Sequence, residues 1–186
     1  MYGIDIPAGT RPDVHCMAFM ILTVSRPSEA RLVEWKEIDL EERVWIKPAH
    51  KYKSILEWKI PLCPTAIKIL KSMPKRRGRI FSTLNGTEIH DKYLSTMQDA
   101  LGFDAVAHGF RATFRTWGQE QQRFTEEALE LCLKHVDTDS TRAAYKRSQI
   151  FTERKRIIST YEKWAMKSDI GQTKKVVSIT NQKKAS

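Results

Sequence analysis

At 186 residues, with 41% hydrophobic and 29% charged residues, the chain has the size and composition of one soluble globular domain with a buried core. Its formal net charge of +10 favours a polyanionic partner, and nucleic acid fits better than a membrane because no long basic amphipathic stretch occurs; plain solubility charge is the alternative. The three cysteines, Cys16, Cys63 and Cys132, are widely spaced without a C-x-x-C pair, which argues against a disulfide framework or a structural zinc site and suits a reducing cytosol.

The first expected element is a buried helix. Residues 1–12 are rich in glycine and proline and should be irregular. The apolar residues 16–24 predict a helix, although the run 17–24 is too short to span a bilayer. The helix should stop before Arg26, because Pro27 disfavours helical geometry at the residue that precedes it.

A second helix should follow directly. Pro27 suits its first position, and Glu29, at the third position, can reach back to the Arg26 amide. This helix is expected to continue to about Trp35. Arg26 thus lies at a break between two helices, where a side chain can be held rigidly and still point into a cleft. A buried structural arginine is the alternative interpretation.

Two strands with a basic connection come next. Residues 43–46 predict a short strand, and residues 56–62 alternate between apolar and polar side chains with the period of two that is typical of a half-buried strand. Residues 48–54 join them as the tip of a β-hairpin and include Lys53. A lysine in such a turn is usually just solvated.

The rest of the chain predicts further helices. Their expected positions are residues 65–73, 91–101, 108–117, a helix opened by residues 125–127, and a last helix that contains Tyr145 and continues through residues 151–164. The basic residues 75–79 form a loop that suits a phosphate contact and an exposed turn equally well. Beyond residue 167 the chain is a basic tail.

The helix at residues 108–117 combines two faces. Phe110, Phe114 and Trp117 follow helical spacing and form an apolar stripe. His108 and Arg111 lie on a neighbouring face, with Arg115 one further turn along. The helix can therefore bury its aromatic rings while it presents cationic and hydrogen-bonding groups beside the core.

The chain contains the groups that metal-free cleavage of a phosphodiester requires. A tyrosine can attack the phosphorus, two guanidiniums can bind the non-bridging oxygens, imidazoles can add donors or move the tyrosine proton, and a lysine can protonate the departing 5′ oxygen. Nearby arginines would also lower the pKa of the phenol from its ordinary value of about 10. Histidine, arginine and tyrosine without metal-ligand spacing indicate chemistry on an anion, and phosphate is the obvious candidate.

These residues resemble the phage-type tyrosine recombinases, specifically the integrases of prophages and genomic islands. The matching segments, in chain order, are Leu22-Thr23-Val24-Ser25-Arg26-Pro27-Ser28-Glu29-Ala30, Trp35-Lys36-Glu37-Ile38-Asp39-Leu40, Lys53 at its distance from Ile60-Pro61-Leu62, His108 with Arg111, Leu133-Lys134-His135 and Ala144-Tyr145-Lys146-Arg147. The resemblance covers about residues 17–165, and six functional positions in the right order make it specific.

The resemblance implies a fold and a site. The fold would be α+β and mainly α, with the tyrosine-recombinase catalytic architecture and a small antiparallel sheet. The division would be an irregular lead-in at residues 1–16, the catalytic domain at 17–165 and a basic tail at 166–186. The implied catalytic residues are Arg26, Lys53, His108, Arg111, His135 and Tyr145, with Lys53 as general acid and Tyr145 as nucleophile.

The resemblance also implies an activity and partners. The protein would cleave and rejoin double-stranded DNA at attachment sites through a 3′-phosphotyrosyl intermediate, with neither metal nor nucleotide cofactor, and so promote integration and excision of a prophage or genomic island. A homotetramer on DNA is implied, with accessory DNA-bending or directionality factors, no membrane association, and a place in the bacterial cytoplasm at the nucleoid.

Two alternatives remain at this stage. One is a non-catalytic DNA-binding module, because integrases usually carry an N-terminal core-binding domain that this chain does not show. A chain without it should bind DNA weakly and with strong salt dependence. The other is a type IB topoisomerase, which shares the chemistry but does not exchange strands between partners.

Overall fold

The computed structural model describes residues 11–51, 57–74, 77–83, 86–90, 92, 109–134 and 140–166, and in the last range it describes side chains from residue 150 onward. The helices are α1 (Pro12–Thr23), α2 (Pro27–Arg31), the 3-10 helix η1 (Trp35–Glu37), α3 (Pro64–Ser72), α5 (Gly109–Glu120), α6 (Glu126–Cys132) and α7 (Ser140–Ala165), and the strands are β1 (Ile38–Asp39), β2 (Val44–Lys47) and β3 (Trp58–Pro61). The protein is mainly helical with one small antiparallel sheet, as predicted.

Helix α1 begins at Pro12, four residues before the predicted start, so the end of the predicted irregular lead-in is helical. Pro12 occupies the first helical position, where its missing N–H costs nothing, and Asp13 places a carboxylate in the first turn. The helix ends as predicted before Arg26. Val24 takes a left-handed conformation (φ 54°), and the Ser25 amide donates to the Met20 carbonyl at 3.2 Å, which closes the last turn.

Helix α2 starts at Pro27 as predicted but ends at Arg31, so the expectation that it continues to Trp35 is wrong. The backbone beyond α2 bonds elsewhere. The Trp35 amide donates to the Gly78 carbonyl at 3.1 Å, and the Ile80 amide donates to the Val33 carbonyl at 3.0 Å. These long-range hydrogen bonds satisfy the groups that a longer helix would have used.

The sheet has the order β1-β2-β3, and both neighbouring pairs are antiparallel. Val44 lies opposite Pro61, and Lys47 opposite Trp58, which confirms the predicted hairpin. Strand β1 was not predicted, because two residues are too short to show alternation. Trp45 and Lys47 point to the same, inward side of β2, as residues two apart in a strand do.

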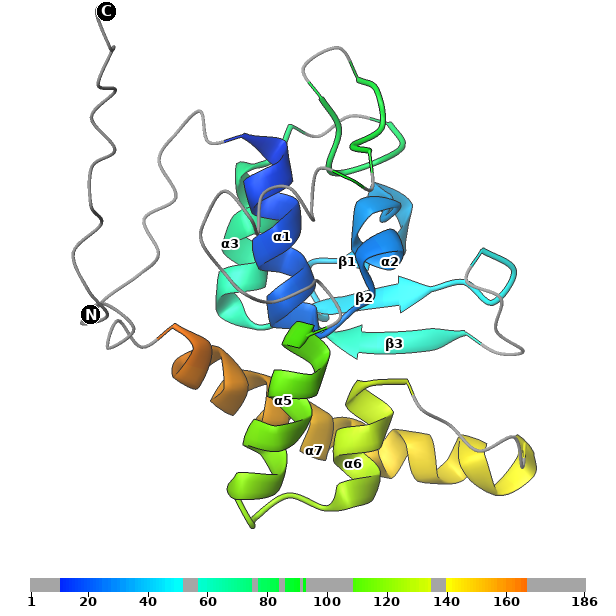
Figure 1. Ribbon diagram of the computed structural model, residues 1–186. Helices are drawn as coiled ribbons and strands as arrows, with labels where there is room; N and C mark the ends of the chain where they lie inside the picture. The colour runs from blue at the N-terminus through cyan, green and yellow to red at the C-terminus, as the bar shows by residue number, and fades with distance from the viewer. Residues whose placement is uncertain are drawn as a thin grey trace, which may run out of the picture.

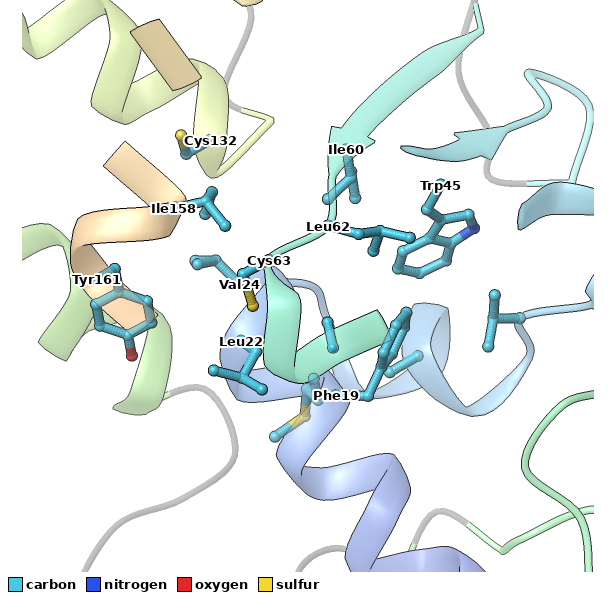
Figure 2. Packing of buried hydrophobic residues seen from close by; sticks show 14 of the residues in the cluster. Phe19, Leu22, Val24, Trp45, Ile60, Leu62, Cys63, Cys132, Ile158 and Tyr161 are labelled. Atoms are coloured by element: carbon cyan, nitrogen blue, oxygen red, sulfur yellow. The ribbon is translucent and has the colours of Figure 1, made fainter. Parts of the chain in front are cut away.

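Figure 1 shows α1, α2 and α3 grouped at one end of the protein and α5, α6 and α7 at the other. Helix α7 joins the two groups, because it contacts α1, β3, α5 and α6. The close view in Figure 2 shows side chains from α1, the sheet, α6 and α7 meeting in one buried cluster. The three cysteines are buried and free, in agreement with the predicted absence of a disulfide framework. Among the described helices, none combines the length and apolar character that crossing a bilayer requires.

Gly118 lets α5 approach α6 closely. A Cβ added there would lie 2.4 Å from Cδ2 of Leu129, a fully buried side chain of α6. We expect Gly118→Ala to lower the free energy of unfolding by about 1 kcal/mol, because overpacking (~1–3 kcal/mol) exceeds the gain in helix propensity (~1 kcal/mol). Urea denaturation measures the difference. Thr116→Ala, on the exposed face of the same helix, is the control, and a Gly118→Ala protein as stable as that control would contradict the close packing.

Candidate functional site

Arg26 lies in the break between α1 and α2, as predicted. Its backbone is extended (φ −73°, ψ 152°), and Pro27 starts the next helix. The Arg26 amide donates to Oε2 of Glu29 at 2.9 Å, which confirms the predicted cap. The guanidinium lies 3.6 Å from the other Glu29 oxygen, and the Arg26 side chain is 39% exposed. Arg26 is therefore held at its backbone while its charged end reaches solvent.

Arg111 lies in the first turn of α5 and connects three parts of the chain. Its Nη1 donates to the Val24 carbonyl at 2.5 Å, and its Nη2 donates to the Leu133 carbonyl at 2.6 Å. These bonds tie α5 to the end of α1 and to the end of α6, and they leave the residue only 7% exposed. Burial lowers the pKa of Arg111, and the charge of Arg26 lowers it further. The two arginines, far apart in sequence, thus act on each other in the fold.

Two lysines complete this group. Lys47 is paired with Glu29 at 2.5 Å and is 1% exposed. Lys134 follows α6 in a left-handed conformation (φ 57°). Burial lowers its pKa; Glu29 opposes that shift and Arg26 adds to it. We call these residues the Arg26 cluster: Arg26, Glu29, Lys47, Arg111 and Lys134.

The Arg26 cluster holds an excess of positive charge. The cluster has four cationic side chains and one carboxylate, that of Glu29, so the formal charge of the cluster is 4 − 1 = +3. Outside the cluster, Glu130 also acts on Arg111, and it forms an ion pair with Arg115 at 2.7 Å. Arg115 also pairs with Glu126 at 3.1 Å, so both of these ion pairs join α5 to α6. A group with this excess of positive charge among its members is suited to an anion with several negative oxygens.

The structure reports on only part of the predicted catalytic set. Arg26 and Arg111 are brought together. Lys53, His108 and His135 lie outside the described residues, and Tyr145 lies in α7 at a position whose side chain is not described. Within the described part of the chain, no group of histidine, cysteine and acidic residues is arranged to hold a metal ion.

The helix that carries Tyr145 is anchored further along its length. Arg154 donates to the Lys59 carbonyl at 2.9 Å, and its guanidinium lies 4.8 Å from the centre of the Trp58 ring. Glu162 accepts the Thr65 amide at 2.6 Å at the start of α3. These contacts fix α7 against β3 and α3, and so fix the backbone direction from which Tyr145 is presented.

Sequence reasoning did not identify Lys47 or Lys134 as members of the site. A signal for Lys47 was available, because a lysine two residues from Trp45 in a strand occupies an inward position and needs a carboxylate partner. Lys51 was also missed. Its ammonium donates to the Leu32 carbonyl at 2.6 Å and to Glu34 at 2.8 Å. Lys51 therefore holds the chain that follows β2 against the segment after α2.

The buried Lys47 predicts a pH effect on stability. Burial lowers the pKa of Lys47 from 10.5 to about 8, although Glu29 opposes the shift. Between pH 8 and 10.5 the unfolded chain would bind the proton that the folded chain releases, so this group makes folding more favourable as pH rises. Relative to Lys47→Met, wild type should gain on the order of 3 kcal/mol of unfolding free energy across that range. Denaturant unfolding of both proteins at several pH values measures it, and parallel pH curves would contradict it.

Comparison with known proteins gives similar sequences among integrases. The chain is 29% identical to prophage integrase IntA of Escherichia coli (strain K12) over 160 residues, which cover 82% of this chain and 38% of that protein. It is 29% identical to prophage integrase IntZ of the same strain over 149 residues, which cover 76% and 37%. It is 27% identical to the integrase of Enterobacteria phage P4 over 187 residues, which cover 88% and 42%.

The chain spans about two fifths of the length of the curated relatives it matches. No family model matches it, and no solved structure gives a significant match. Each of these alignments covers three quarters of the chain or more. By sequence, this chain is similar to phage and prophage integrases over most of its length.

Proposed function

We propose that this chain is the catalytic domain of a site-specific tyrosine recombinase, which cleaves and rejoins DNA through a 3′-phosphotyrosyl intermediate. The observation that carries the proposal is the Arg26 cluster, in which two arginines distant in sequence meet with a net positive charge. The similarity to phage and prophage integrases supports the same class of reaction.

The two arginines would bind the scissile phosphate in different ways. Arg26 is partly exposed and would donate to a non-bridging oxygen directly. Arg111 donates two of its five N–H groups to backbone carbonyls. These bonds fix the plane of its guanidinium and hold its charge near Arg26. Donors held in place before the reaction need no reorganisation when charge develops on the phosphate oxygens, and each contributes about 10²–10³ in rate.

The covalent steps follow from the resemblance. The Tyr145 hydroxyl would attack the phosphorus while the bond between the phosphorus and the 5′ oxygen breaks. Lys53 would protonate that oxygen. His108 and His135 would add donors to the phosphate or move the tyrosine proton. Attack by the 5′ hydroxyl of a second strand would release Tyr145 and reform a phosphodiester, so the bond energy is retained and neither metal nor nucleotide is required.

The wider assembly is part of the proposal. Residues 17–165 would form the catalytic domain, after a lead-in at 1–16 and before a basic tail at 166–186. Four copies would act on attachment sites in double-stranded DNA, with accessory bending or directionality factors, to integrate or excise a prophage or genomic island in the bacterial nucleoid. Salt sensitivity of DNA binding is expected from the excess of basic residues.

A nicked suicide duplex tests the proposal. Cleavage near the nick releases a short fragment that carries the 5′ hydroxyl needed for rejoining. Because this fragment diffuses away, the covalent protein–DNA adduct accumulates. The adduct is detected on a denaturing gel after incubation in a chelator, with a panel of candidate attachment sequences. DNA retention without any adduct would indicate a binding module instead, and relaxation of supercoiled DNA without recombinants would indicate a topoisomerase.

A further inference from the structure

We propose that Lys47 is a positioning residue for Arg26: from inside the fold it binds the Glu29 carboxylate and thereby keeps that carboxylate from closing onto the Arg26 guanidinium. The inference rests on the proposed function, because it assigns Arg26 to the phosphate. It adds a residue to the site that lies one layer behind the arginine.

Lys47 is too deeply buried to touch DNA. Its side chain is 1% exposed, and its ammonium lies 2.5 Å from Oε1 of Glu29 and 5.2 Å from the centre of the Trp45 ring. It is the last residue of β2, on the inward side of the strand. Any effect of Lys47 on a phosphate must therefore pass through its neighbours.

Glu29 connects Lys47 to Arg26. One carboxylate oxygen accepts the Arg26 amide at 2.9 Å, and the other oxygen is shared between Lys47 at 2.5 Å and the Arg26 guanidinium at 3.6 Å. The unequal distances show which cation holds this oxygen. Without the Lys47 ammonium, the same carboxylate would be drawn toward Arg26 and would neutralise the charge that the phosphate needs.

Packing alone does not account for a lysine at this place. The other inward residue of β2 nearby is Trp45, and an apolar side chain of similar length would fill the position without taking a charge out of water. Besides Glu29, Lys134 and Arg26 also act on Lys47, and both oppose its protonation. The presence of the Lys47 ammonium in these surroundings is explained if it serves to bind the Glu29 carboxylate.

The arrangement also joins two predicted catalytic segments. Lys47 ends the strand that leads toward Lys53, whereas Glu29 and Arg26 belong to the break before α2 and its first turn. The ion pair between Lys47 and Glu29 therefore fixes the base of the hairpin strand to the segment that carries Arg26.

The test measures single-turnover adduct formation on the nicked suicide duplex at saturating protein, together with DNA affinity. Lys47→Met should slow cleavage by about tenfold or more, short of the 10²–10³-fold expected for loss of a phosphate donor itself, with little change in affinity. The double variant Lys47→Met/Glu29→Gln should recover much of the rate, because the amide no longer neutralises Arg26. The double variant also removes both charges of the buried ion pair together, so neither is left unpaired, which guards against misfolding.

Leu70→Ala, which empties part of the core in α3, serves as a control matched for lost thermal stability. Its cleavage rate should stay close to wild type at a temperature where both proteins are folded. A Lys47→Met protein that cleaves as fast as wild type, or whose loss is not recovered by Glu29→Gln, overturns the inference alone. A wild type that forms no adduct overturns the proposed function and this role of Lys47 with it.

Discussion

Tyr145→Phe is expected to abolish the covalent protein–DNA adduct while DNA binding is retained. The substitution removes the one oxygen that would attack the phosphorus and leaves the ring in place. Loss of an enzyme nucleophile lowers the rate by on the order of 10⁶-fold, which puts the residual reaction below detection on a denaturing gel. Gel-shift titration at low salt measures the affinity in parallel.

Tyr161→Phe is the matched control, because Tyr161 lies in the same helix and loses the same atom. Its ring is enclosed by aromatic neighbours, with ring centres 4.9 Å from Phe114 and 5.1 Å from Trp117. Burial raises the pKa of Tyr161 to about 12, so its hydroxyl is a poor nucleophile. Tyr161→Phe should therefore form the adduct normally. An adduct from Tyr145→Phe, or its loss in Tyr161→Phe, would contradict the assignment.

The features that sequence analysis predicted correctly are those set by neighbouring residues. Pro27 ends one helix and starts the next, and Glu29 reaches back three residues to the Arg26 amide. The helix predicted to open at residues 125–127 is α6, which Thr125 caps by accepting the Ala128 amide at 3.3 Å. Each outcome depends on backbone chemistry within one helical turn, so the local sequence contains the information.

The features that it missed depend on residues far along the chain. Helix α2 stops early because residues 33–35 bond to residues 78–80, and nothing near Trp35 indicates this pairing. Lys47 is buried because the fold brings Glu29 to it. The site shows the same limit. A family resemblance proposed Arg26 and Arg111 as partners, and only the fold shows that each influences the other's surroundings, whereas Lys53, His108 and His135 stay predictions.

Arg111→Ala is expected to impair both the fold and cleavage, whereas Arg26→Ala impairs cleavage alone. Arg111 is 7% exposed and supplies donors to the Val24 and Leu133 carbonyls at 2.5 and 2.6 Å. Hydrogen bonds from a charged donor contribute about 1.5–3 kcal/mol each, so the free energy of unfolding should fall by about 3 kcal/mol or more. For a chain of this size the melting temperature should fall by roughly 10 °C. Differential scanning calorimetry measures the shift, and the suicide duplex measures the rate.

Arg26→Ala provides the contrast, because the bond that ties this residue to Glu29 comes from its backbone amide and survives the substitution. Loss of the partly exposed guanidinium should lower the cleavage rate by about 10²–10³-fold, with little change in melting temperature. Arg111→Lys separates charge from geometry, since one ammonium cannot reproduce the fork that reaches two carbonyls on different elements. An Arg111→Lys protein that kept wild-type stability and rate would show that charge alone suffices at this position. Loss of both would show that the arginine is needed because it joins the break before α2 to the end of α6, and so builds the place where the phosphate is expected to bind.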